Sequence, residues 1–89
     1  MATVSFTQNL KRHVDCPTVE AEGTTVAEVL AAVFTGNPRL RGYIVDERGV
    51  LRRHMVIFVD GEQLKDRERL SDAVQPRSAI YVMQALSGG

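Results

Sequence analysis

The last six residues of the chain, QALSGG, are better suited to chemistry than to packing. Gly88 and Gly89 have no side chain to bury, and glycine loses more backbone entropy on ordering than any other residue. A structural end would more naturally be a capped helix or a paired strand. We therefore expect the chain to finish in a loose extension rather than in a packed element.

No other group of residues has the types and spacing of a catalytic or metal site. Cys16 is the only cysteine, which excludes an internal disulfide and a zinc or iron–sulfur cluster of thiolates. His13 has no second ligand at metal spacing, so we expect a surface residue and no metal. The paired charges of DERG and DRER are not the isolated carboxylates in an apolar cleft that acid–base catalysis needs. The sequence thus predicts a protein that is not itself an enzyme and binds no cofactor.

Size and composition indicate one ordinary globular domain. A chain of 89 residues can bury one modest core. Eleven basic residues balance eleven acidic ones, which argues against nucleic acid or membrane bound through bulk charge. There is no apolar run of membrane-spanning length and no signal-peptide pattern at the start, so we expect a cytoplasmic protein.

The first part of the chain predicts two strands and a helix. Alternating polar and apolar residues predict a strand near 2–9 and a short second strand over 18–23, joined by a hairpin-like turn. Thr25 and Glu28 have the spacing of a capping box before apolar residues at helical spacing. We expect this helix to end at Gly36.

The next part predicts the other side of a sheet. Residues 43–45 are expected to form a short extended piece, and HMVIFV, over 54–59, has the most continuous β-type pattern and predicts a central strand. Asp60 and Gly61 are the strongest tight-turn signal. They should return the chain as a short partner strand at EQL, with Leu64 pointing inward.

The remaining residues complete the sheet. Residues 66–78 predict a polar loop with a helical turn, and AIYVMQA, over 79–85, predicts a final strand. The helix must cover one face of a mixed sheet, and the last strand can pair with the first in the middle. This order predicts an α+β fold of the β-grasp, or ubiquitin-like, type, with about five strands and one main helix. We expect a β-grasp domain over 1–84 and a flexible, protruding C-terminal tail over 85–89.

Strand alternation predicts which side chains of the last strand meet partners. Ile80 and Val82 share one face, and Tyr81 and Met83 share the other. We expect the first pair under the helix and the second on the open face, because a flexible Met and an amphipathic Tyr suit a surface that meets several partners. Ordinary, partly covered sheet residues are the alternative.

The basic run Arg52-Arg53-His54 is a second candidate for contact with a partner. Its charge could steer the chain toward an acidic groove. A solvated loop edge is the alternative interpretation.

The whole chain resembles the MoaD/ThiS family of ubiquitin-like sulfur carriers. The resemblance rests on the strand-strand-helix opening, on HMVIFVDGEQL with its turn, and on the closing AIYVMQALSGG. The segment RLRGYIVDERGVLRRHMVIFVDG is most similar to CysO-type carriers, in which a comparable loop precedes the central strand. The commoner family ending has Pro and then Val-Ala before the glycines, whereas this chain has QALS.

The resemblance implies that the chain is a cosubstrate of an ATP-dependent, ubiquitin-activating-enzyme-like adenylyltransferase. That enzyme would form an acyl-adenylate at Gly89, and sulfur would then replace the adenylate to give a thiocarboxylate. Gly88 would suit a narrow channel in which a Cβ would clash. The residues implied for tail recognition are Gln84, Ala85, Leu86 and Ser87, and those implied for docking are Tyr81, Met83, Arg52 and Arg53.

The resemblance also implies the type of downstream partner. The sulfur acceptor would be a cysteine synthase, molybdopterin synthase or thiazole synthase type of enzyme, and a metalloprotease could process the tail. Two alternatives stay open. A lysine amine could attack activated Gly89, which would make the chain a protein modifier, or the chain could be a β-grasp interaction module whose tail has no chemistry.

Overall fold

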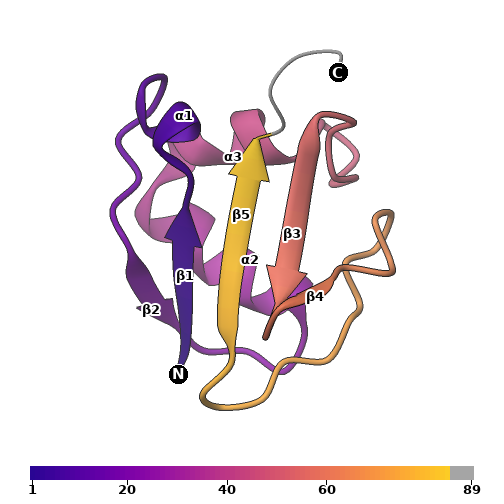
Figure 1. The fold of residues 1–89 in the computed structure, drawn as a ribbon. Coiled ribbons are helices and arrows are strands. Elements are labelled where there is room, and N and C mark those ends of the chain that lie inside the picture. Colours follow the sequence, from indigo (N-terminus) through magenta and orange to yellow (C-terminus); the bar gives the residue numbers. More distant parts are fainter. Residues whose placement is uncertain (85–89) are drawn as a thin grey trace.

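The chain forms a five-stranded mixed sheet with helices on one face (Figure 1). The computed structural model describes residues 1–84, so the tail predicted over 85–89 lies outside the described residues and the domain division stays a prediction. The strands are β1 (Ala2–Phe6), β2 (Val19–Ala21), β3 (Met55–Val59), β4 (Glu62–Gln63) and β5 (Ala79–Gln84). The helices are α1 (Gln8–Lys11), α2 (Val26–Gly36) and α3 (Pro38–Ile44). This is the predicted β-grasp architecture.

The strands lie in the order β2-β1-β5-β3-β4. β5 is parallel to β1 and antiparallel to β3, so the first and last strands pair in the middle, as predicted. β3 was expected to be central, and it does have a neighbour on each side, but β5 occupies the middle of the sheet. None of the helices in residues 1–84 is long and apolar enough to cross a membrane.

The core lies between the sheet and the helices. Val4 of β1, Ile57 of β3, and Ile80 and Val82 of β5 are all buried on the helix side, which confirms the parity predicted for the last strand. The helices contribute Leu10, Val26, Val29, Leu30, Val33, Leu40 and Ile44, and the loops contribute Leu51, Leu64, Leu70 and Val74. The expected loop over 66–78 thus supplies two core residues through its turns.

The strand predicted over 2–9 is too long. β1 ends at Phe6, and α1 then turns Leu10 into the core, where it is fully buried. Backbone bonds from Lys11 N–H to Thr7 O and from Val14 N–H to Leu10 O hold this turn. The link from β1 to β2 is therefore a short helix and a loop, not the expected hairpin-like turn.

The extended piece predicted over 43–45 is also wrong, except at Val45. The other two residues close α3, in which Leu40 and Ile44 lie on one buried side. Pro38 stands in the first turn of α3, where its missing N–H breaks no helical bond. The only helical signal in RLRGYI is the spacing of four between Leu40 and Ile44. This signal was too weak to compete with the β-type residues around it.

The capping box of α2 is shifted by one residue. Thr25 Oγ1 accepts a hydrogen bond from Glu28 N–H at 3.2 Å, as predicted. The carboxylate of Glu28 instead reaches Thr24, whose N–H and hydroxyl donate to its Oε1 at 2.8 and 3.0 Å. These two bonds lower the pKa of Glu28. The helix still ends at Gly36, as expected.

The turn between β3 and β4 ties the hairpin to the start of β5. Asp60 and Gly61 both have positive φ, 51° and 84°, as a tight hairpin turn requires. The Asp60 carboxylate accepts hydrogen bonds from Ala79 N–H at 2.9 Å and from the Ser78 hydroxyl at 2.7 Å, and both bonds lower its pKa. Leu64, just after β4, is buried as predicted.

Gly23 fixes the approach of β2 to α2, and we predict that Gly23→Ala destabilises the fold by about 1–3 kcal/mol. An added Cβ would lie 2.7 Å from the backbone nitrogen of Val29 and 2.9 Å from the Cβ of Glu28, so α2 would have to shift. Gly42→Ala is the matched control, because a Cβ there has nothing within 4 Å. Urea unfolding measures both, and equal free energies of unfolding for the two variants would contradict the close approach.

Candidate functional site

The candidate site begins where β5 ends, at the last described residue before the predicted tail. Gln84 pairs with Met55 of β3 on one side. On the other side, Thr7 N–H donates to Val82 O at 3.1 Å, and Thr7 Oγ1 accepts from Gln84 N–H at 3.4 Å. The base of the tail is therefore held on both sides, at the end of the sheet near α1 and the start of β3 (Figure 1).

The side chain of Gln84 has an unusual environment. Its Oε1 is buried and has no hydrogen-bond partner within residues 1–84. A buried carbonyl oxygen without a donor costs free energy, so this atom is a ready acceptor at the base of the tail. The other residues predicted to recognise the tail, Ala85, Leu86 and Ser87, lie outside the described residues, as do Gly88 and Gly89.

The open face of the sheet carries an apolar patch beside this base. Tyr81 is 40% exposed, and Met83 is half-buried on the same side. Phe58 lies opposite Tyr81 and Val56 lies opposite Met83 on the neighbouring β3. We call these four residues the open-face patch. Phe58 and Val56 were not among the predicted docking residues, although the alternation of β3 places them together on this face.

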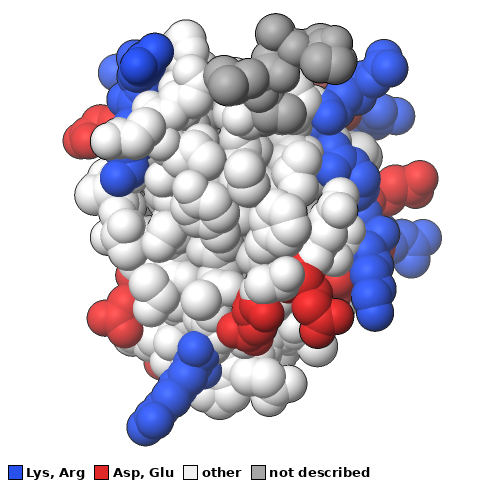
Figure 2. All heavy atoms as spheres, in the orientation of Figure 1, with Lys and Arg blue, Asp and Glu red and all other residues white. Residues whose placement is uncertain are grey.

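Basic side chains flank the open face (Figure 2). Arg52 and Arg53 are exposed and lie just before β3, with His54 between, so they are at the end of the sheet where β5 finishes. Arg52 Nε donates to Gly42 O at 2.7 Å. Arg67 Nη2 donates to Arg52 O and to Met55 O, both at 2.8 Å. Sequence reasoning missed Arg67, because nothing in DRER shows that its side chain returns to the basic run.

A second basic group lies on the other side of β5. Lys11 and Arg12, at the end of α1, are exposed and follow Thr7, which contacts the last residue of β5. The base of the tail thus lies between two groups of positive charge, next to an uncharged apolar patch. Such a surface fits a partner whose docking site has an apolar centre and an acidic rim.

The remaining sequence candidates do not join this site. Cys16 is buried, and its burial raises the pKa of the thiol, while Lys11 lowers it and Asp15 raises it, so the thiol stays protonated near neutral pH. His13 stacks on Tyr43, with ring centroids 6.4 Å apart. Within residues 1–84, no group of three His, Cys, Asp or Glu side chains could hold a metal ion.

The fold and this surface define a ubiquitin-like β-grasp protein with an apolar sheet face beside the base of its C-terminus. A sequence profile described as the ThiS family matches residues 6–89, which is nearly the whole chain and includes both final glycines. The chain therefore belongs to the ThiS family and is a ubiquitin-like protein of the sulfur-carrier type. A search of curated protein sequences gave no match.

Solved structures with the same fold include two CysO proteins and small archaeal modifier proteins. The CysO chain of the Amycolatopsis orientalis BexX/CysO complex is 27% identical, with full coverage of both chains (100% and 100%) and a TM-score of 0.84. Mycobacterium tuberculosis CysO is 22% identical, with 97% of this chain and 100% of that chain covered and a TM-score of 0.81. Small archaeal modifier protein 1 from Methanosarcina acetivorans is 21% identical, with coverage of 99% and 95% and a TM-score of 0.81.

We predict that Arg67→Ala loosens the basic run and costs about 2 kcal/mol, because charge-assisted hydrogen bonds to two backbone carbonyls are lost. Amide hydrogen exchange should become faster over residues 52–55. Arg69→Ala is the control, since the exposed Arg69 side chain makes no hydrogen bond within residues 1–84. Unchanged exchange at residues 52–55 in Arg67→Ala would show that Arg67 does not hold this segment.

Proposed function

We propose that this chain is a sulfur carrier whose Gly89 is adenylated and then converted to a thiocarboxylate that donates sulfur in biosynthesis. The observation that carries the proposal is the ThiS-family match, which extends through Gly88 to Gly89. The reacting group is the terminal carboxyl, so the chain acts as a cosubstrate and its partners supply the catalysis.

Two steps make the carboxyl group reactive. An oxygen of the Gly89 carboxylate attacks the α-phosphorus of ATP, and pyrophosphate leaves. A sulfur nucleophile delivered by a partner then attacks the carbonyl carbon of the acyl-adenylate, and AMP leaves with the bridging oxygen. With sulfide (HS⁻) as that nucleophile, the terminal carbon then carries one oxygen and one sulfur, and this thiocarboxylate is the nucleophile that reaches the acceptor.

The folded body supplies the binding energy that the tail lacks. Holding residues 85–89 extended in a channel costs backbone entropy of about 1–2 kcal/mol per residue. The open-face patch, with Tyr81 and Met83, offsets this cost through apolar burial on an activating enzyme. Arg52 and Arg53 add charge complementarity and faster association. In the bound state, Gln84 Oε1 accepts a hydrogen bond from a donor on the enzyme or from the tail.

The proposed partners follow from this chemistry. The first is an adenylyltransferase of the ubiquitin-activating-enzyme type, which uses ATP, so the carrier itself holds no cofactor. The second is a sulfur-acceptor enzyme of the cysteine synthase, molybdopterin synthase or thiazole synthase type. The CysO neighbour was itself solved in a complex with another protein, BexX, which supports a dedicated protein partner for the carrier. A metalloprotease that processes the tail is a further proposed partner.

A second candidate function uses the same activated Gly89. Attack by a lysine amine on the acyl-adenylate, or on a thioester made from it, forms an isopeptide bond and makes the chain a protein modifier. The observation that favours this candidate is the structural similarity to small archaeal modifier protein 1. A β-grasp interaction module without tail chemistry is the third possibility, and it predicts that a blocked C-terminus leaves function intact.

Intact mass tests the carrier proposal. Untagged protein is incubated with ATP, a sulfide source and the activating enzyme from the same cell. We expect a mass gain equal to the replacement of one oxygen by sulfur, and no gain when Gly89 is deleted. Absence of both the thiocarboxylate and the adenylate, with an activating enzyme shown to be active, would overturn the carrier and modifier proposals together. Adducts on lysine side chains of other proteins would favour the modifier.

The docking role of the open face has a separate test. Tyr81→Asp should raise the KM of the activating enzyme for the chain by about tenfold or more, because it places a charge in the centre of an apolar interface. Tyr81 is 40% exposed, and urea unfolding of both variants checks that they stay folded. Ala31→Asp, an exposed position of α2 on the other side of the sheet, is the control. Equal KM values for the two variants would show that the activating enzyme does not dock on the open face.

A further inference from the structure

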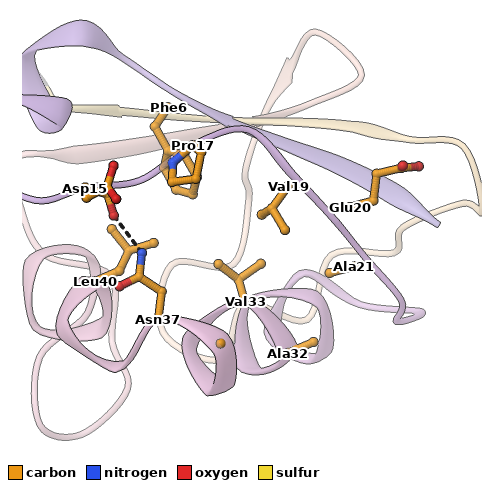
Figure 3. A pocket seen from close by; sticks show the side chains of 11 residues that line it. Phe6, Asp15, Pro17, Val19, Glu20, Ala21, Ala32, Val33, Asn37 and Leu40 are labelled. Carbon is orange, nitrogen blue, oxygen red and sulfur yellow. Dashed lines mark hydrogen bonds between the residues drawn. The ribbon is translucent and has the colours of Figure 1, made fainter.

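A groove lies at the other edge of the molecule, between β2 and the helices (Figure 3). Its volume is about 440 Å³. Pro17 and Val19 form one wall, Ala32 and Gly36 of α2 form the other, and Leu40 closes one end. The groove is on the helix side of the sheet, whereas the open-face patch is on the opposite side. The carrier function proposed above makes no use of it.

The groove is lined mainly by apolar side chains, and a hydrogen bond holds its two walls together. Val19 lies on the helix side of β2, opposite Val4, yet it is 36% exposed because no strand within residues 1–84 lies beyond it. Figure 3 shows its side chain directed toward Val33 of α2 across the groove. Asn37 Nδ2 donates to Asp15 O at 2.8 Å, which fastens the loop before β2 to the junction of α2 and α3. An apolar side chain could enter between the two valines without separating the walls.

The wall formed by β2 also has a free backbone edge. Within residues 1–84, β2 is the outermost strand and pairs only with β1. Thr3 N–H donates to Ser78 O and Thr7 N–H donates to Val82 O, so the odd-numbered residues of β1 direct their backbone toward β5. Strand alternation then directs the backbone of the even-numbered residues of β1 toward β2. Glu20, which lies opposite Thr3, therefore directs its N–H and C=O away from the sheet.

Negative charge surrounds this edge. Asp15, Glu20 and Glu22 are exposed, and no lysine or arginine lines the groove. Within residues 1–84 the only ion pair joins Arg48 to Asp46, so the three carboxylates near the groove are not neutralised there. Acidic side chains are visible at this edge of the molecule in Figure 2.

We propose that this groove binds an extended peptide segment of a partner protein. The segment adds a strand to the free edge of β2 and exchanges backbone hydrogen bonds with Glu20. One of its aliphatic side chains enters between Val19 and Val33, and flanking lysine or arginine residues pair with the carboxylates of Asp15 and Glu22. The proposal goes beyond the carrier function and does not depend on it.

The position of the groove has a consequence for assembly. The open-face patch and the base of the tail lie on β3 and β5, while the groove is reached from β2 and α2. A partner can therefore hold the chain through the groove while an enzyme engages its sheet face and C-terminus. Such a partner would recruit the chain without blocking its reacting group.

Two synthetic peptides test the chemistry of the occupant. The acetylated and amidated peptide KTVIVTK should bind at low ionic strength, about fivefold or more tightly than its charge-reversed counterpart ETVIVTE. Ala32→Gln should weaken KTVIVTK about fivefold, because the added side chain fills the groove and excludes an anchor methyl group. Ala31→Gln, the next position of α2 and outside the groove, should bind the peptide as the original chain does.

Calorimetric titration measures these affinities, and urea unfolding confirms that both variants are folded. Amide hydrogen exchange tests whether the peptide adds a strand to β2. Bound KTVIVTK should slow exchange of the Glu20 amide and leave the exchange rate of the Tyr81 amide unchanged. The proposal is overturned if KTVIVTK does not bind, if the two peptides bind equally, if Ala32→Gln has no effect, or if Glu20 is not protected. The proposal would also be overturned if the chain self-associates and Ala32→Gln abolishes this self-association, because the occupant of the groove would then be a second copy of the chain.

Discussion

The parallel pairing of β5 with β1 is the interaction on which the rest of the structure depends. It joins the first and last strands of the chain in the middle of the sheet, so the loop-closure entropy of nearly the whole chain must be offset by this contact. The offset comes from Val4, Ile80 and Val82, which the pairing buries beneath α2. As a result, the C-terminal end of β5 is held between β3 and Thr7, the residue after β1, and any group attached beyond it starts from a fixed position.

The sheet separates two kinds of surface. Its helix side is filled by the core and carries the groove beside β2, while its open side exposes the patch around Tyr81 and Phe58. Alternation along each strand makes this separation, since neighbouring residues point to opposite faces. In the proposed function the body needs no catalytic pocket, because it positions the base of the tail and presents two surfaces that do not overlap. The open-face patch and the base of the tail meet at the C-terminal half of β5, while the groove lies beside β2.

Most strands and the main helix could be predicted from the sequence. The elements that were missed share one physical cause. The tight turn at Asp60, the helix that starts at Thr25 and the parity of β5 were all predicted, because each has a local signal. α1 and α3 were not, because short helices are formed by burial of one or two side chains, such as Leu10 and Ile44, and only the tertiary structure shows that burial. Contacts between distant segments were missed for the same reason. The side chain of Arg67 and the groove beside β2 both bring together residues with no common sequence pattern.

The central claim is that Gly89 carries the reacting carboxyl group and that the folded body provides the surface by which partner enzymes bind it. The most direct measurement is the exchange of labelled pyrophosphate into ATP by the activating enzyme from the same cell, with the full chain compared to a chain that lacks only Gly89. The account predicts exchange that requires the full chain, together with equal thermal unfolding of the two proteins. Exchange at the same rate with the shortened chain, or none with the full chain and an enzyme of proven activity, would contradict it.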